Sequence, residues 1–175
     1  MTNPRLLVGR YPISGKFHHI VTCTVNHWPI FGDFNNARIL VLTMRELEFE
    51  CAAHTFCFVI MPDHAHWVIQ LLPDQSLGNV VKLLKGRSAR RINQERNTCG
   101  TLWQGGYFER TIKSSDDLLR TGQYIVENPV RAGLVSDLGQ YPHWDGVWLR
   151  DLNDGWAARG STNEVEMTGL KGVSD

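Results

Sequence analysis

One segment of the chain constrains the fold more than any other: residues 54–72 read HTFCFVIMPDHAHWVIQLL. The segment contains two runs rich in β-branched and aromatic residues, which are typical of strands. Between the runs stand Pro62 and Asp63, and this dipeptide is a frequent turn signal. The segment therefore predicts a β-hairpin, and the remaining elements have to be arranged around its two strands.

The rest of the chain alternates between the periodicities of strands and of helices. In chain order it predicts a strand at 16–26, a helix capped by Asn35 or Asn36 that reaches Cys51, the hairpin, a helix capped by Ser76, a strand at 107–113, and a helix that starts at Ser114 and runs to about Asn128, where Pro129 ends it. The order β-α-β-β-α-β is typical of an α+β, ferredoxin-like split antiparallel sheet with helices on one face. The last helix, which contains Tyr124, is added C-terminally to this unit.

The 175 residues carry no net charge, but their charges are unevenly distributed. Between residues 76 and 113, eight Lys and Arg stand against two acidic residues, whereas seven acids stand against three bases from Ser136 onward. A basic segment of this kind is typical of phosphate binding. The alternative is an ordinary solvated helix face. The candidate DNA-binding residues are Lys82, Lys85, Arg87, Arg90, Arg91 and Arg110.

No stretch of the sequence approaches the roughly 20 apolar residues that a membrane-spanning helix needs. The first residues also lack the apolar core and cleavage site of a secretory signal. We therefore expect a cytoplasmic protein without a membrane partner. Residues 1–150 are expected to form one domain. Residues 151–175 are acidic and lack aromatic residues after Gly160, so we expect them to form a mobile tail.

Two histidines follow the turn of the hairpin at alternate positions, His64 and His66. Side chains at i and i+2 of a strand share a face, so both imidazoles can reach one metal ion. Ala65 and Trp67 would then lie on the opposite face, packed against helices. The pattern alone is more typical of ordinary core or surface histidines. Asp63 is either a hydrogen-bond partner that orients a ligand or simply a turn residue.

Tyr124 and Asn128 stand four residues apart, a spacing that makes side chains neighbours on one face of a helix. They could share a site, although a helical Tyr often packs half-buried and an Asn before Pro often ends a helix. Two imidazoles and one amide oxygen would form an open ligand set that suits Mg²⁺ or Mn²⁺ better than structural zinc. Such an ion polarises a phosphoryl oxygen, and a tyrosine oxygen is a competent nucleophile.

Several stretches resemble one known family. MPDHAHWVI resembles the His-hydrophobe-His (HUH) signature of single-strand transposases, and TLWQGGYFERTI followed by DDLLRTGQYIVENPVRAGLV resembles their C-terminal half. Over residues 10–148 the chain is similar to the REP-associated tyrosine transposases, which are related to the single-strand insertion-sequence transposases. The resemblance implies the HUH endonuclease fold, with Tyr124 as the catalytic nucleophile. It also implies a divalent ion, Mg²⁺ or Mn²⁺, on His64, His66 and Asn128.

The resemblance further implies an enzyme that cleaves and rejoins hairpins of repetitive extragenic palindromes (REP) through a 5′-phosphotyrosine intermediate. Its partner would be single-stranded or hairpin DNA at the nucleoid, and a monomer is favoured over a dimer. Two alternatives stay open: a hairpin-binding module without catalysis, and a metal-dependent phosphodiesterase that uses water. Trp103 and Tyr107 are candidates either for stacking an unpaired base or for packing in the core.

Overall fold

The computed structural model describes residues 16–146, and the predicted tail at 151–175 lies outside this range. Its elements in chain order are β1 (Phe17–Cys23), α1 (Phe34–Phe49), β2 (Ala53–Ile60), β3 (His64–Leu71), α2 (Leu77–Glu95), β4 (Phe108–Ile112), α3 (Ser115–Val126), α4 (Asn128–Arg131) and β5 (Trp144–Gly146). Short 3-10 turns at Val25–His27, Ile30–Gly32 and Leu138–Gln140 connect some of them. Within this range, no helix combines the length and the apolar composition required to cross a membrane.

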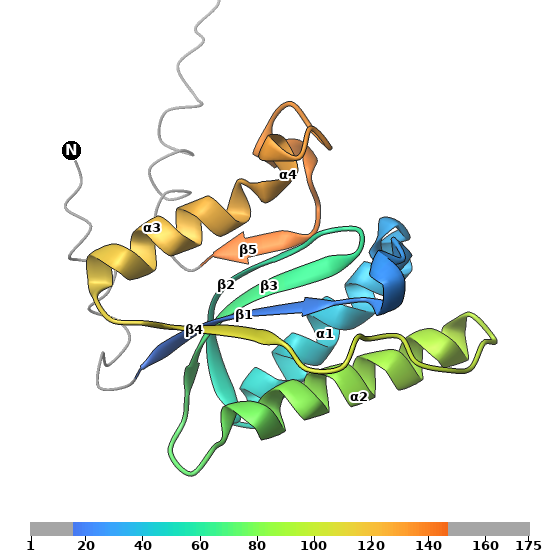
Figure 1. Cartoon of the computed structure of the whole chain (residues 1–175), viewed down its shortest axis with the longest axis horizontal. Helices are drawn as coiled ribbons and strands as arrows, with labels where there is room; N and C mark the ends of the chain where they lie inside the picture. The colour runs from blue at the N-terminus through green and yellow to red at the C-terminus, as the bar shows by residue number, and fades with distance from the viewer. Residues whose placement is uncertain (1–15, 147–175) are drawn as a thin grey trace, which may run out of the picture.

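The strands form one sheet in the order β4-β1-β3-β2-β5, and every pairing of neighbours is antiparallel (Figure 1). The first four strands have the order of the predicted split β-α-β-β-α-β unit, which confirms the fold class. Strand β5 was not predicted, because its three residues are too short to show a periodicity. It extends the sheet beyond the hairpin by pairing Gly146 with Cys57 of β2.

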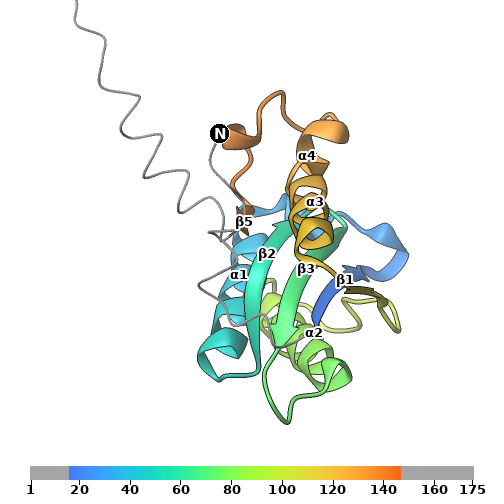
Figure 2. The same cartoon turned by 90° about the vertical axis from the view of Figure 1, so that its left-hand side faces the viewer.

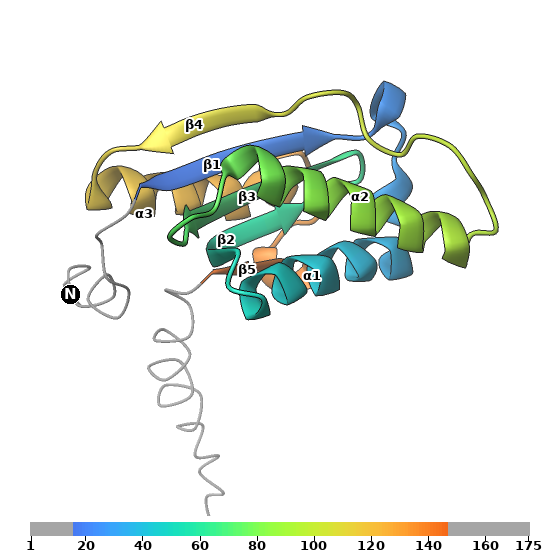
Figure 3. The same cartoon turned by 90° about the horizontal axis from the view of Figure 1, so that it is seen from below.

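Helices cover both faces of the sheet, whereas the sequence predicted them on one face. Helices α1 and α2 lie side by side on one face, and α3 crosses the other (Figures 2 and 3). Alternation along β3 serves both layers: Ala65, Trp67 and Ile69 belong to the core under α1 and α2, and Val68 belongs to a second core under α3. The prediction that the helices lie on one face of the sheet is therefore correct for the β-α-β-β-α-β unit and wrong for the added helix α3.

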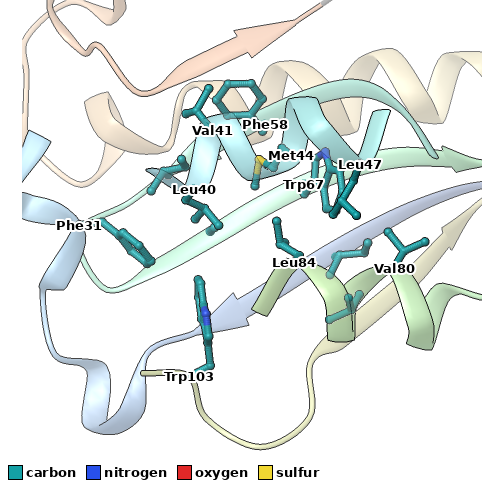
Figure 4. Close-up of a cluster of buried hydrophobic side chains, with 14 of the residues drawn as sticks. Phe31, Leu40, Val41, Met44, Leu47, Phe58, Trp67, Val80, Leu84 and Trp103 are labelled. Carbon is teal, nitrogen blue, oxygen red and sulfur yellow. The ribbon is translucent and has the colours of Figure 1, made fainter. Parts of the chain in front are cut away.

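The larger core lies between the sheet and the α1/α2 layer (Figure 4). Trp67 stands at its centre, 1% exposed, and its indole Nε1 donates a hydrogen bond to Thr55 Oγ1 at 3.1 Å. Trp103 packs against Phe31 in the same core, with 5.2 Å between ring centroids, and donates to Ser88 Oγ at 3.1 Å. Trp103 is 4% exposed, so the core interpretation applies to it and the base-stacking one does not.

The helix starts agree with the sequence at two places and differ at one. Ser76 and Ser114 cap α2 and α3, because their hydroxyls accept hydrogen bonds from backbone N–H groups of the first turn. Helix α1 is capped by Asp33, whose carboxylate accepts from the backbone N–H groups of Asn35 and Asn36. The predicted caps Asn35 and Asn36 are thus the residues that are capped.

Candidate functional site

The two histidines of the HUH stretch share one face of β3, as predicted. His64 pairs with Cys23 of β1 and His66 pairs with Val21. Both face the α3 layer, because Ala65 between them is buried on the α1/α2 side. The ring centroids of the two histidines are 5.0 Å apart with an interplanar angle of 78°. Two imidazoles held at this separation can approach the same small ligand.

Asp63 orients His64 through a short hydrogen bond. His64 Nδ1 lies 2.6 Å from Asp63 Oδ1, and His27 Nδ1 lies 2.7 Å from Asp63 Oδ2. Burial alone would raise the pKa of Asp63, but the hydrogen bonds from His64 and His27 lower it below its ordinary value. An ionised carboxylate only accepts, so the proton of His64 stands on Nδ1. The lone pair of His64 is therefore on Nε2.

His66 is hydrogen-bonded through the same ring nitrogen, Nδ1, to a third histidine. Its Nδ1 lies 3.0 Å from His19 Nε2 of β1, and the two rings stack with 5.3 Å between centroids. Burial, followed by the charges of His64, His19 and Arg131, lowers the pKa of His66 to about 3. Burial and Arg110 lower the pKa of His19 to about 4. Both rings are therefore neutral at pH 7, the form in which imidazole binds metals.

Tyr124 and Asn128 contact the same side chain, Arg131. Tyr124 on α3 is 61% exposed, and the guanidinium carbon of Arg131 lies 3.8 Å from the centroid of its ring. Arg131 Nη2 donates to the backbone oxygen of Tyr124 at 2.5 Å and to Asn128 Oδ1 at 2.7 Å. The charge of Arg131 is also one of the causes that lower the pKa of His66, after burial and the charges of His64 and His19.

The two histidines can hold a divalent ion only together with a ligand that is not His, Cys, Asp or Glu. Within residues 16–146, no group of three or more side chains of those four types could hold a metal ion. His64 and His66 supply two nitrogens, and the amide of Asn128 offers an oxygen. That oxygen accepts from Arg131 and has a second lone pair. Asn128 Nδ2 donates to the backbone oxygen of Ile125 at 2.9 Å, which fixes the amide plane.

Of the six candidate DNA-binding cations, Arg110 alone lies on the histidine face. It stands opposite His19 in the pairing of β1 with β4, and its Nη2 donates to both carboxylate oxygens of Asp117 of α3, at 2.6 and 2.9 Å. The other five are on α2, which packs on the opposite face of the sheet. Tyr107, the remaining stacking candidate, is 40% exposed.

The five α2 cations differ in what they contact. Arg87 pairs with Glu50 at 2.7 Å and Arg91 pairs with Glu46 at 2.8 Å. Lys85 Nζ donates to the backbone oxygens of Gln104 and Gly106, so it holds the loop that leads to β4. Among the described residues, Lys82 and Arg90 form no ion pair. The basic segment of the sequence is therefore partly structural.

Sequence reasoning missed two residues of this site, His19 and Arg131. Arg131 follows Asn128 by three residues and Tyr124 by seven, so helical spacing could have indicated it. His19 meets His66 only through the register of β1 on β3, which no local pattern encodes.

Comparisons with known proteins point to one family. The family described as "Transposase IS200 like" matches residues 14–128 of this chain. The ISDra2 transposase TnpA of Deinococcus radiodurans is 27% identical over 114 residues, which cover 61% of this chain and 80% of that protein. A Haemophilus influenzae protein named as a REP-associated tyrosine transposase is 27% identical over 100 residues, covering 51% of this chain and 56% of that protein.

The fold is also found among solved structures. A REP-associated tyrosine transposase bound to a REP hairpin superposes with a TM-score of 0.66 at 20% sequence identity, covering 83% of this chain and 84% of that chain. The similarity inferred from the HUH stretch and the Tyr124 stretch is confirmed by these matches.

Proposed function

Because the chain belongs to the IS200-like transposase family, we propose that it cleaves and rejoins single-stranded or hairpin DNA through a 5′-phosphotyrosine intermediate on Tyr124. One observation carries the proposal: His64 and His66 share a face, and each has its Nδ1 hydrogen-bonded so that Nε2 is left for a ligand. The activity is assigned to the domain expected over residues 1–150. Its substrates would keep the protein with the nucleoid in the cytoplasm.

A divalent ion, Mg²⁺ or Mn²⁺, would be held by His64 Nε2, His66 Nε2 and the side-chain oxygen of Asn128. When bound, the ion polarises a phosphoryl oxygen and helps to orient the scissile phosphate. Asp63, whose carboxylate only accepts, keeps His64 in the tautomer that has its lone pair on Nε2, and His19 contacts the corresponding Nδ1 of His66. Arg131 keeps the oxygen of Asn128 in a fixed direction.

Tyr124 would supply the nucleophile. Its phenolic oxygen loses its proton and forms a bond to phosphorus while the bond from phosphorus to the 3′ oxygen breaks. The departing 3′ oxygen takes up one proton to become a 3′ hydroxyl, so no proton is gained or lost overall. One phosphate ester replaces another, so a 3′ hydroxyl can reverse the step and rejoin the strands. Arg131 lies across the Tyr124 ring, which supports a role in holding the phenol toward the phosphate.

The DNA would contact the protein on two sides. Arg110 stands beside His19 and would bind phosphates near the cleavage point. Lys82, Lys85, Arg87, Arg90 and Arg91 would contact phosphates away from it, with Lys82 and Arg90 contributing most because neither has a carboxylate partner among the described residues. A hairpin substrate is supported by the structurally similar transposase, which was solved with a REP hairpin.

Three mechanisms give different products in one experiment. The protein and its Tyr124→Phe variant are incubated with end-labelled hairpin DNA and Mn²⁺ or Mg²⁺ and resolved on a denaturing gel. The proposal expects a covalent protein–DNA band that is absent with Tyr124→Phe. Cleavage that persists in the variant would instead indicate a phosphodiesterase that uses water. Binding without cleavage by the unaltered protein would indicate a hairpin-binding module.

A further inference from the structure

His19 makes a specific contact with His66 across the β1–β3 pairing. His19 stands opposite Val68 and His66 opposite Val21, so the two histidines are diagonal neighbours on the same face of the sheet. The contact joins His19 Nε2 to His66 Nδ1 at 3.0 Å, and the rings lie nearly parallel at 24°. A hydrogen bond combined with ring stacking fixes both the direction and the tilt of the His66 ring.

We propose that His19 is a positioning residue, which holds His66 in the orientation and tautomer needed for metal binding; this inference rests on the metal site proposed above. A metal on His66 Nε2 requires the ring proton on Nδ1, where it is donated to His19 Nε2. His19 must then carry its own proton on Nδ1. Hydrogen bonds of this kind to ligating imidazoles tune metal affinity, typically by 10–100-fold.

Two residues of β4 surround the ring of His19 on the side away from His66. Phe108 of β4 packs its ring edge-on against His19 with 6.3 Å between centroids, and Arg110 stands opposite His19 in the sheet register. The ring of His19 thus stacks on His66 and meets Phe108 in a T-shaped contact with an interplanar angle of 73°. Asp63 plays the matching part for His64, so each of the two ligands has its own orienting group.

The chain contains a matched control for His19 in the preceding residue. His18 points to the opposite face of β1, where its Nδ1 lies 2.9 Å from Glu109 Oε1. It is the same residue type in the same strand, with a carboxylate partner and without a contact to His64 or His66 among the described residues.

The test measures binding of Mn²⁺ alone by electron paramagnetic resonance, together with thermal melting of each variant. His19→Leu and His19→Phe remove the acceptor, and they should weaken Mn²⁺ binding by about 10–100-fold. His19→Gln places an amide oxygen where Nε2 stands and should restore affinity to within about threefold of the unaltered protein. His18→Gln should bind Mn²⁺ as the unaltered protein does. His19→Phe keeps a flat ring and serves if His19→Leu does not fold.

Two results would overturn the inference. One is a folded His19→Leu or His19→Phe protein that binds Mn²⁺ as tightly as the unaltered chain. The other is equal weakening by His19→Gln and His19→Leu, which would indicate packing and not the hydrogen bond. If the unaltered chain binds Mn²⁺ no better than His64→Ala/His66→Ala does, the metal site itself is wrong, and the inference is wrong with it.

Discussion

The two faces of the sheet differ in what their side chains do. On the α1/α2 face, β3 contributes Ala65, Trp67 and Ile69 to a continuous apolar core. On the α3 face, the same strand contributes His64 and His66, whose neighbours are His19 and Asp63. A single strand thus stabilises the domain on one side and places the two candidate metal ligands on the other. Substitutions at successive positions of β3 should therefore give opposite results.

The largest effects are expected from the neighbours Trp67 and His66. Trp67→Ala removes a fully buried indole and should lower the free energy of unfolding by about 3–5 kcal/mol. His66→Ala should leave the protein folded and reduce the rate of DNA cleavage by about 10²–10³-fold, the usual cost of losing one group that stabilises developing charge.

Denaturant unfolding and single-turnover cleavage, measured on both variants, check this pair. Each variant is the control for the other, because the residues are adjacent in sequence and point to opposite faces. A His66→Ala protein with full cleavage activity would break the comparison. So would a Trp67→Ala protein as stable as the unaltered chain.

Replacing the arginine beside Tyr124 should slow cleavage, whereas replacing an arginine on α2 should not. Arg131→Ala removes both the cation from the Tyr124 ring and the hydrogen bond to Asn128, and we expect cleavage to slow by about 10–100-fold. Arg131→Lys should recover only part of the rate, because an ammonium lacks the planar fork. Arg87→Ala on α2 loses one exposed ion pair with Glu50, worth at most about 1 kcal/mol, and should cleave bound DNA normally. Single-turnover rates at saturating DNA measure all three.

DNA affinity should also differ between substitutions on the two faces, by a smaller amount than the cleavage rate does. Replacing both Lys82 and Arg90 by Ala should reduce the slope of log K against log salt by about 0.7–0.9 for each lost phosphate contact. The cleavage rate of bound DNA should stay unchanged. Arg110→Ala should lower affinity and rate together, because Arg110 adjoins His19. Fluorescence anisotropy titrations at several salt concentrations provide the slopes, and an unchanged slope for the α2 variant would show that this helix does not contact DNA.

The smallest expected effect is on how the free energy of unfolding depends on pH. The pKa of His19 is lowered to about 4 and that of His66 to about 3, so both accept protons near pH 6.5 only in the unfolded chain. The contribution of these two histidines to the free energy of unfolding is therefore fully present above about pH 6.5, and it declines as the pH falls toward 4. After allowance for solvent screening, each residue should contribute on the order of 1 kcal/mol between pH 7 and 5. In metal-free denaturant titrations His66→Gln should show a shallower decline, and identical declines would refute this.

Much of the fold was predictable because its signals are local. The hairpin at Pro62-Asp63, the caps Ser76 and Ser114, and the alternation that separates His66 from Trp67 all depend on neighbours in sequence. What the sequence misassigned or left open depends on tertiary contacts. The α3 layer lies opposite α1 and α2, and Trp103 is in the core because Phe31 and Ser88 meet it there.

The candidate site was predictable only in its outline. Helical spacing related Tyr124 to Asn128 and could also have indicated Arg131, but only the structure shows the hydrogen bonds that join Arg131 to both residues. The basic pattern on α2 indicated charge without showing that Glu46 and Glu50 of α1 neutralise part of it. Pairing between strands distant in sequence brought His19 to His66.

The most direct test of the central proposal is to identify the residue that carries the DNA. The unaltered protein is reacted with a REP-type hairpin and Mn²⁺, digested with protease and nuclease, and its peptides are sequenced by mass spectrometry. The proposal predicts a nucleotide attached to Tyr124 through its 5′ phosphate, and a free 3′ hydroxyl on the released strand. A nucleotide on any other residue, or cleavage that leaves every peptide unmodified, would contradict it.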